Sequence, residues 1–397
     1  MKISSISFAA LAVSALACSG SGPGGPGDPP QTHELRWGLV DETTFAVTDW
    51  GSLETCASEL ALDGSGTPLL AWYDGMAYGA ARMHRYSKPF WSELGGVVTQ
   101  PKTAMQMIAA SRTVSGDPVL VRVDPSTHDV IATRWTGSIW EDLGTAIPGN
   151  GSYWLRAAAG PDGPMVAWLD YGPASGGYSG RVARWNGTDW IILGTARPVF
   201  PPSGTNPVVQ LSIAVAPSGD PVVAYIGASD TLHVDRWDAE GLSTWVALPA
   251  PPAPPNPAKN VSVAVDGDGA VYFAPSYLTG GEFEIAAVYR LAPDATAWTS
   301  LGKPPSNGLS ASMVALHGLQ GSGVFAGWTG AFSYYGGGGE PELARWTPAG
   351  WERVVTSWGP DWSSQWRPRI QPVSDTDVWF GFNDQTTLHV TRWQLLP

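Results

Sequence analysis

Short apolar runs separated by turn residues repeat along most of the chain. A clear example is residues 212–216, which are followed by a turn at 217–220 and a second apolar run at 221–225. Runs of this length, bounded by Gly, Pro, Asn and Asp, are typical of antiparallel strands joined by tight turns. Four such runs occur in each unit. The pattern therefore predicts a series of four-stranded antiparallel sheets and no helical domain.

The unit is marked by an arginine followed by an aromatic residue, and by a second tryptophan after a turn. The arginine pairs are Arg85-Tyr86, Arg134-Trp135, Arg184-Trp185, Arg236-Trp237, Arg290-Leu291, Arg345-Trp346 and Arg392-Trp393. The second tryptophans are Trp91, Trp140, Trp190, Trp245, Trp298 and Trp351. The pairs are 47 to 55 residues apart, which is the range of four-stranded propeller blades. Copies spread over the whole chain cannot all form one active site, so we expect them to pack and pair within the fold.

The two ends of the chain each hold part of this unit. Residues 387–393 supply the part up to the first tryptophan, and residues 34–40 supply the part around the second, which is Trp37. A repeat divided between the termini is how a ring of repeats closes. We therefore expect an all-β, seven-bladed β-propeller over residues 34–397, with an N-terminal strand at 34–40 joining the C-terminal blade. We expect no second domain.

The residues of the repeat also resemble those of known proteins. Residues 184–194 read Arg-Trp-Asn-Gly-Thr-Asp-Trp-Ile-Ile-Leu-Gly, and residues 218–225 read Ser-Gly-Asp-Pro-Val-Val-Ala-Tyr. This residue pattern resembles bacterial propeller repeats of the kelch and sialidase-like kinds over nearly all of residues 34–397. The Ser-x-Asp-x-Gly-x-x-Trp box of sialidases is met in no copy, and the paired glycines of kelch are absent in register. The resemblance implies the fold and says little about function.

Residues 1–18 resemble a bacterial export signal with a lipobox-like end. Lys2 precedes an apolar stretch at 3–17, which is too short to span a bilayer stably. The end of this stretch, Ala15-Leu16-Ala17-Cys18, follows the order of a lipobox, except that lipoboxes usually have Leu at the place of Ala15. The resemblance implies lipidation of Cys18, and the Gly/Pro-rich residues 19–33 read as a tether. We expect an exported outer-membrane lipoprotein or cell-surface protein that touches the membrane only through its lipid. The alternative is an ordinary cleaved signal peptide.

Charge and residue spacing narrow the range of partners. The net charge of -13 and the pI near 4.8 disfavour nucleic-acid binding, which requires a basic face. The six histidines show no metal-ligand spacing, and Cys18 and Cys56 are the only cysteines. We expect no metal, no cofactor and a monomeric protein.

The units differ most where the second strand of each sheet ends, and these differences mark the predicted site. In propellers the loops after this strand share one face with the channel mouth. The first three units place Asp74, Asp124 and Asp170 there, preceded two residues earlier by Trp72, Arg122 and Trp168. Aromatic residues in neighbouring loops add Tyr178, Tyr334, Trp362 and Trp366. We expect these ten residues to bind ligand, whereas the alternative is that the aspartates cap turns.

These observations predict a non-catalytic binding protein whose partner is a glycan or an envelope protein. The alternative is a carbohydrate-active enzyme, a sialidase-like glycoside hydrolase or lyase, that uses the same carboxylates as acid and base. An acidic sugar would also call for an arginine cluster at the channel mouth, and Arg122 is the candidate on the second strands. A third interpretation is a scaffold for envelope complexes. We assign no catalytic residue.

Overall fold

The computed structural model describes most of the repeat region. The described residues are 36–46, 58–74, 80–98, 108–124, 126–150, 153–172, 177–199, 211–227, 230–239, 241, 243–279, 282–285, 287–305, 314–329, 341–355, 368–383 and 387–396. Trp37–Leu396 forms one compact unit, and of the residues outside it the structure describes Arg36 alone. No helix within the described ranges is long and apolar enough to cross a membrane.

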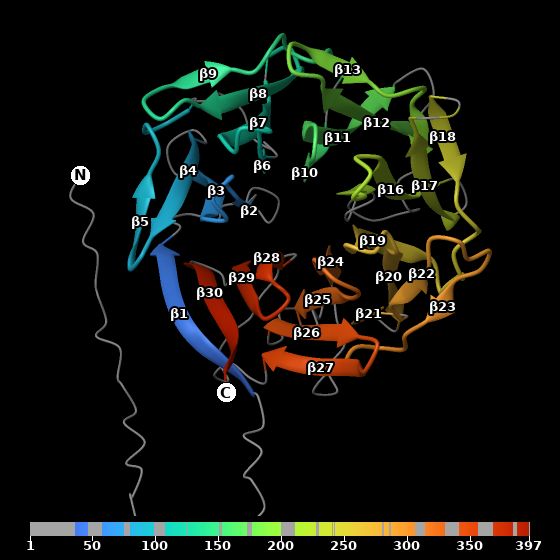
Figure 1. Ribbon diagram of the computed structural model, residues 1–397. Coiled ribbons are helices and arrows are strands. Elements are labelled where there is room, and N and C mark those ends of the chain that lie inside the picture. The colour runs from blue at the N-terminus through green and yellow to red at the C-terminus, as the bar shows by residue number, and fades with distance from the viewer. Residues whose placement is uncertain are drawn as a thin grey trace, which may run out of the picture. The chain divides into compact units, whose positions relative to one another are not determined.

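The strands of the larger unit form seven antiparallel sheets, which Figure 1 shows arranged around a central axis. Six sheets have their four main strands in the order of the chain, from the axis outward, and two of these carry one extra strand; the seventh ends on the N-terminal strand. The seven-bladed β-propeller that the repeat predicts is therefore confirmed.

The first three blades come from residues 58–199. Blade 1 consists of β2 (Ser58–Leu62), β3 (Pro68–Asp74), β4 (Ala80–Ser87) and β5 (Phe90–Glu93). Blade 2 consists of β6 (Ile108–Arg112), β7 (Pro118–Val123), β8 (Val130–Trp135) and β9 (Trp140–Asp142). Blade 3 consists of β10 (Tyr153–Gly160), β11 (Gly163–Gly172), β12 (Gly177–Trp185) and β13 (Trp190–Ile192), with β14 (Arg197–Val199) paired to β12.

The next three blades continue the order. Blade 4 consists of β15 (Leu211–Val215), β16 (Pro221–Ile226), β17 (Leu232–Asp238) and β18 (Thr244–Ala247). Blade 5 consists of β19 (Ala258–Val265), β20 (Val271–Thr279), β22 (Tyr289–Leu291) and β23 (Thr299–Ser300), with β21 (Glu282–Ile285) paired to β20. Blade 6 consists of β24 (Val314–Gly318), β25 (Val324–Thr329), β26 (Pro341–Thr347) and β27 (Gly350–Val355).

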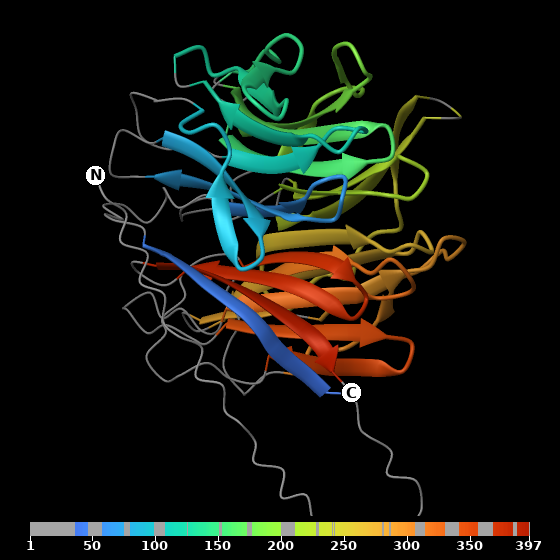
Figure 2. The ribbon, with the colours of Figure 1, turned by 60° about the vertical axis from the view of Figure 1, so that its left-hand side comes forward.

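Blade 7 joins the two ends of the repeat region. It consists of β28 (Arg369–Ser374), β29 (Asp377–Asn383), β30 (Thr387–Leu396) and, as its outer strand, β1 (Arg36–Ala46). Figures 1 and 2 both show β1 beside β30. The predicted closure is confirmed: β1 includes residues 36–40 of the predicted segment and continues to Ala46, while residues 34 and 35 lie outside the described ranges. It is longer than the outer strands of the other blades, which have two to six residues.

The hydrophobic core is divided among the seven junctions between blades. Each of seven buried clusters takes its side chains from two neighbouring blades, and the last cluster joins blade 7 to blade 1. Trp168, Trp328 and Trp379 are the largest side chains that are fully buried in these junctions. A single sheet of this kind cannot cover both of its faces, so closing the ring is what buries them.

The second tryptophans hold neighbouring blades together. In five junctions the indole Nε1 donates to a backbone carbonyl oxygen at the outer end of the preceding blade, over 2.7 to 2.9 Å. The donor and acceptor pairs are Trp140 to Leu94, Trp190 to Leu143, Trp245 to Leu193, Trp298 to Pro249 and Trp351 to Leu301. Their recurrence confirms the structural role that the repeat predicts.

Several of the repeated arginines are engaged within the fold as well. Arg85 pairs with Asp63 at 2.5 Å, and Arg345 pairs with Glu352 at 2.6 Å. Arg392 donates twice to the Asp377 carboxylate, at 2.9 and 2.5 Å. These contacts lie within or between blades, as expected for a structural motif.

Candidate functional site

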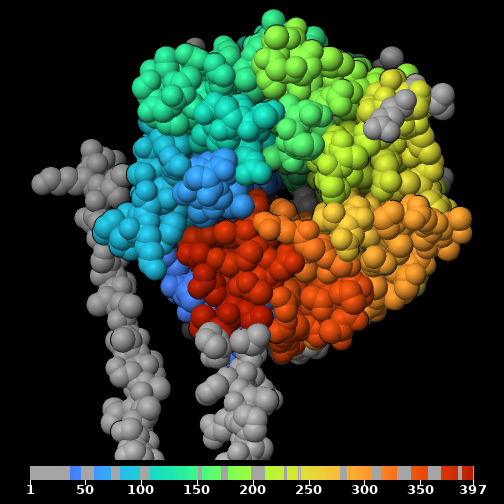
Figure 3. All heavy atoms as spheres, viewed as in Figure 1, coloured from blue at the N-terminus to red at the C-terminus, as the bar shows by residue number. Residues whose placement is uncertain are grey.

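A central channel lies on the axis of the ring. The innermost strands of all seven blades line it, and it encloses about 290 Å³. Figure 3 shows this hollow at the centre of the ring. Small-molecule sites typically enclose about 300–1,000 Å³, so the channel lies just below the lower end of this range and suits a small ligand.

The backbone itself makes the channel wall polar. Each of β2, β6, β10, β15, β19, β24 and β28 lies at the end of its sheet's strand order and so pairs along one edge only. The other edge faces the axis and presents backbone N–H and C=O groups. Two of these groups are used between blades, because Val263 N donates to Ser212 Oγ at 3.2 Å and Leu316 N donates to Ser262 Oγ at 3.0 Å.

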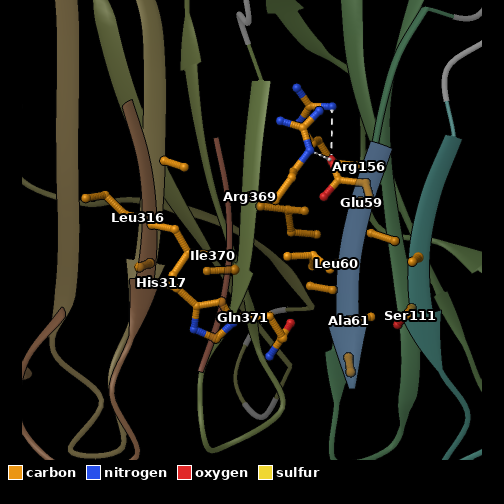
Figure 4. Close-up of a pocket in the computed structure, with 18 of the residues that line it drawn as sticks. Glu59, Leu60, Ala61, Ser111, Arg156, Leu316, His317, Arg369, Ile370 and Gln371 are labelled. Atoms are coloured by element: carbon orange, nitrogen blue, oxygen red, sulfur yellow. Dashed lines mark ion pairs between the residues drawn. The ribbon is translucent and has the colours of Figure 1, made fainter. Parts of the chain in front are cut away.

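Three charged side chains meet where the inner strands begin. Glu59 on β2, Arg156 on β10 and Arg369 on β28 come from blades 1, 3 and 7. One carboxylate oxygen, Glu59 Oε1, lies 3.8 Å from an Arg156 terminal nitrogen and 3.4 Å from Arg369 Nε. Figure 4 shows both arginines pointing toward Glu59 across the channel. We call these three residues the channel triad.

Arg156 is the residue of the channel triad whose pKa is lowered by burial. Its side chain is 11 % exposed, and burial lowers its pKa to about 10, although Glu59 acts in the opposite direction and Arg369 adds to the lowering. Arg156 still carries its charge at neutral pH. One hydrogen bond runs from its terminal nitrogen to Leu155 O at 2.9 Å, and its Nε has no hydrogen-bond partner in the described part of the chain.

A local irregularity of β10 sets the position of Arg156. The pairing of β10 with β11 changes register between Tyr153 and Arg156, which is a β-bulge. Trp154 lies inside this step with a φ of 52°, a left-handed value that is uncommon for a bulky residue. Bulges re-aim side chains near sites, and here the bulge precedes the residue that reaches across the channel.

The described residues of the deeper part of the channel include polar side chains and no carboxylate. His317 on β24, Gln371 on β28 and Ser111 on β6 lie there. Burial lowers the pKa of His317, whose Nδ1 lies 3.0 Å from Gly318 O. Ser111 Oγ has no hydrogen-bond partner within the described ranges. Within those ranges no group of three or more His, Cys, Asp or Glu side chains is arranged to hold a metal ion.

The charge of the channel differs from that of the protein. The described lining residues include Arg112, Arg156 and Arg369, and Glu59 is their only carboxylate. The whole chain has a net charge of -13. The described lining therefore carries more arginines than carboxylates, in contrast to the acidic chain as a whole.

The predicted site residues of blade 2 lie beside a turn and outside the channel lining. Asp124 follows β7 and accepts hydrogen bonds from Ser126 N at 2.8 Å, Ser126 Oγ at 2.6 Å and Thr127 N at 3.1 Å. These bonds, led by that of the Ser126 side chain, hold the pKa of Asp124 below its usual value. Arg122, two residues earlier, is 9 % exposed. The geometry of Asp124 is that of a turn cap.

The predicted residues of blade 3 partly meet one another. Asp170 is buried, accepts a hydrogen bond from Trp168 Nε1 at 2.8 Å and pairs with Arg181 at 2.7 Å. Trp168 is fully buried in the junction between blades 2 and 3. Tyr178 packs against the junction between blades 3 and 4. None of these side chains lines the described channel wall.

The remaining predicted residues are Trp72 and Asp74 of blade 1, the aromatic residues of later loops, and Cys18. Trp72 packs at the junction of blades 7 and 1, and its Nε1 donates to His84 Nδ1 at 3.0 Å. Asp74 ends β3, but its side chain lies outside the described residues. Tyr334, Trp362, Trp366 and Cys18 also lie outside them.

Sequence reasoning missed the channel triad because it examined the second strand of each blade. The signal was present one strand earlier. Glu59, Arg156 and Arg369 interrupt first-strand runs in which most other blades carry Ala, Val, Ile or Ser. Arg156 and Arg369 on the first strands line the channel, whereas Arg122 on a second strand does not.

Comparisons with known proteins support the fold. No protein-family model matches the chain, and no curated protein matches it in sequence. A lectin from Aleuria aurantia, solved with the disaccharide Fucα1-6GlcNAc, is similar with a TM-score of 0.51 and 12% identity, over 78% of this chain and 99% of the lectin. AofleA from Arthrobotrys oligospora is similar with a TM-score of 0.50 and 13% identity, over 81% of this chain and 90% of that protein. A further structure of the Aleuria lectin, described as a six-bladed β-propeller, has a TM-score of 0.49 and 15% identity, over 78% of this chain and 99% of the lectin. At these identities the likeness to the first two structures shows a shared fold and no more.

Proposed function

We propose that this protein is an exported, membrane-anchored β-propeller that binds a glycan in its central channel without chemical conversion. The observation that carries the proposal is the channel wall. Seven strand edges present backbone donors and acceptors toward one axis, and the channel triad stands among them. Sugar hydroxyls both donate and accept hydrogen bonds, so a ring of alternating N–H and C=O groups suits them.

The comparisons agree with this proposal at the level of fold. The Aleuria lectin, which is similar in fold, was solved with a bound disaccharide. Propellers host unrelated functions, so the argument for this chain rests on its own channel.

The alternative function is hydrolysis or lysis of a glycan. Glycoside hydrolases place two carboxyl groups about 5–10 Å apart across a shared cleft. The described channel lining offers Glu59 alone, while Asp170 is paired with Arg181 and Asp124 caps its turn. These placements favour binding over catalysis.

A glycan array with a blocked channel tests the proposal. Ala158 lines the channel and is half-buried, so Ala158→Trp fills space that the ligand would occupy. Ile139 is 57% exposed on an outer hairpin, so Ile139→Trp is the matched control. We expect selective binding by the wild type and by the control, and loss of binding by Ala158→Trp. Absence of any glycan binding by the wild type contradicts the proposal, and turnover of a bound glycan supports the enzyme instead.

The location is part of the proposal. The lipobox-like end of residues 1–18 supports lipidation of Cys18, with attachment to the outer membrane or the cell surface. We expect Cys18→Ser to abolish labelling by radioactive palmitate and to release the protein from membranes. Cys56→Ser is the control and keeps both. Labelling that survives Cys18→Ser contradicts the anchor.

A further inference from the structure

We infer that Ser111, His317 and Gln371 in the deeper part of the channel form a subsite for one uncharged sugar residue, which they recognise by the protons of its hydroxyls. We call these three residues the polar layer. The inference rests on the proposed function, and it adds the class of sugar and the side chains that bind it.

Each residue of the polar layer has a hydrogen-bonding atom without a partner among the described residues. Ser111 is 2% exposed, and its Oγ makes no hydrogen bond within those ranges. His317 makes one contact, from Nδ1 to Gly318 O at 3.0 Å, and Gln371 makes one, from Nε2 to Pro372 O at 3.3 Å. Buried polar groups are almost always paired, so the unpaired Ser111 hydroxyl indicates a place that a ligand or a water molecule completes.

The existing contacts decide which atoms of His317 and Gln371 remain for a ligand. Gly318 O and Pro372 O are carbonyl oxygens, which only accept, so His317 donates through Nδ1 and Gln371 through Nε2. Burial lowers the pKa of His317, which keeps the ring neutral and leaves its Nε2 as an acceptor. Gln371 Oε1 is the second acceptor.

Two acceptors and a hydroxyl require a ligand that donates hydrogen bonds. Sugar hydroxyls donate as well as accept, whereas an ionised carboxylate only accepts. The polar layer contains no charged side chain that would offset the burial of an anion. The chemistry of the polar layer therefore points to an uncharged sugar.

Small side chains leave room for the sugar beside the polar layer. Five inner-strand residues pair with the second residue of the strand that follows and so occupy equivalent positions in their blades: Ala61, Ser111, Ala214, Ala264 and His317. Three of the five are alanines, and all five line the channel. The channel encloses about 290 Å³, which suits one sugar residue better than an extended chain.

Fluorinated sugars test the inference on the purified protein. The probes are the methyl glycosides of glucose, galactose, mannose and N-acetylglucosamine, each titrated by calorimetry beside analogues in which one hydroxyl is replaced by fluorine. Fluorine cannot donate a hydrogen bond. We expect at least one glycoside to bind and one of its analogues to bind about tenfold or more weakly, because a site built to pair with a hydroxyl rejects the analogue that lacks it. Methyl glucuronide should bind more weakly than methyl glucoside.

Ser111→Ala separates binding from stability. The Ser111 hydroxyl makes no hydrogen bond with a described residue, so we expect an unchanged or slightly higher free energy of unfolding and about tenfold lower affinity for the glycoside. Ser218→Ala is the control, because Ser218 lies in an exposed turn of blade 4 and donates to Asp220 at 2.8 Å. It should leave affinity unchanged.

Titrating the fluorinated analogues against Ser111→Ala locates the contact. The hydroxyl that Ser111 binds is the one whose replacement by fluorine has little further effect in this variant, since two changes to one interaction are not additive.

The outcomes distinguish this inference from the proposed function. Absence of binding of any glycan to the wild type overturns the proposed function itself. Three results overturn the inference and leave glycan binding standing: no glycoside binds although longer glycans do, every fluorinated analogue binds as tightly as its parent, or the glucuronide binds more tightly than the glucoside. Unchanged affinity of Ser111→Ala would mean that the polar layer holds water only, and it overturns the inference as well.

Discussion

At the scale of single residues, the tryptophans that follow each C–D turn combine packing with a directional hydrogen bond. Trp190 is partly buried against the junction of blades 2 and 3, and its Nε1 donates to Leu143 O at 2.7 Å. Trp91 occupies the equivalent place in blade 1, but its Nε1 has no hydrogen-bond partner among the described residues. The same residue type at two equivalent places therefore contributes differently.

Replacing these tryptophans by phenylalanine separates the hydrogen bond from the ring. Trp190→Phe removes the donor and leaves the Leu143 carbonyl unpaired, so we expect the free energy of unfolding to fall by about 1–3 kcal/mol. Trp91→Phe removes an indole N–H that has no partner among the described residues, so we expect a smaller loss. Urea unfolding of both variants measures the difference. Equal losses would mean that ring size and not the hydrogen bond stabilises the junction.

His84 gives the molecule a pH-dependent contact. It accepts a hydrogen bond from Trp72 Nε1 on Nδ1, which requires the neutral ring, and burial lowers its pKa from 6.5 to about 4, against the effect of Glu93 and with that of Arg82. The unfolded chain therefore takes up the proton first as pH falls. The stability due to neutral His84 is complete above pH 6.5 and is lost progressively as pH falls to about 4.

The pH dependence is checked with His84→Gln, which keeps an acceptor for Trp72 and does not titrate. Between pH 6.5 and 4 we expect the wild type to lose about 2–3 kcal/mol more stability than this variant. His128→Gln, which removes an exposed histidine, is the control. Parallel stability curves for wild type and His84→Gln would contradict the assignment.

At the scale of elements, a glycine after the outer strand lets the next blade approach. Gly144 follows Leu143 with a φ of 76°, and a Cβ placed there would lie 2.4 Å from the Trp185 ring of blade 3. Gly137 in the C–D turn of blade 2 also has a left-handed φ, of 97°, but a Cβ there would meet nothing within 4 Å. Both positions have a left-handed backbone, but only Gly144 lies close to a side chain of the next blade.

Alanine at each glycine measures the fit between blades. Gly137→Ala carries only the cost of the left-handed backbone, which is about 1–2 kcal/mol. Gly144→Ala adds a clash with Trp185, so we expect about 1–3 kcal/mol of further destabilisation. Thermal and chemical unfolding of the pair provide the measurement. A Gly144→Ala variant as stable as Gly137→Ala would show that the junction yields without cost.

The amino-acid sequence was sufficient to predict the blades but not the channel triad. Particular residues show the physical reasons. Apolar runs and tryptophan spacing specify strands and junctions locally, so Trp37 near one end and Trp393 near the other were enough to predict ring closure. Glu59 and Arg369 are 310 residues apart and meet only because the ring closes. The direction of Arg156 depends on a bulge, which shifts the alternation of side chains and leaves no simple pattern in the sequence.

At the scale of the whole molecule, stability depends on the closure of blade 7. β1 (Arg36–Ala46) is the outer strand of a sheet whose other three strands come from the C-terminus. Trp37 on this strand packs against the junction of blades 6 and 7, and the Arg345 guanidinium lies 5.2 Å from its ring centroid. Removing β1 therefore uncovers apolar side chains of blade 7 and leaves an open sheet edge.

Deletion of residues 1–46 tests ring closure. We expect a large fall in the unfolding temperature and a tendency to aggregate. A synthetic peptide of residues 36–46 should restore the unfolding temperature in a saturable manner, since binding to the folded form stabilises it. A scrambled peptide is the control. A deletion variant as stable as the wild type would contradict the role of β1.

The central proposal is that the ligand lies in the central channel. The most direct measurement is a crystal structure of the protein with the glycan that binds most strongly on the array. We expect the glycan between the inner strands, with its hydroxyls on the strand edges that face the axis. A glycan bound on the outer faces of the blades, with the channel free of ligand, would contradict it.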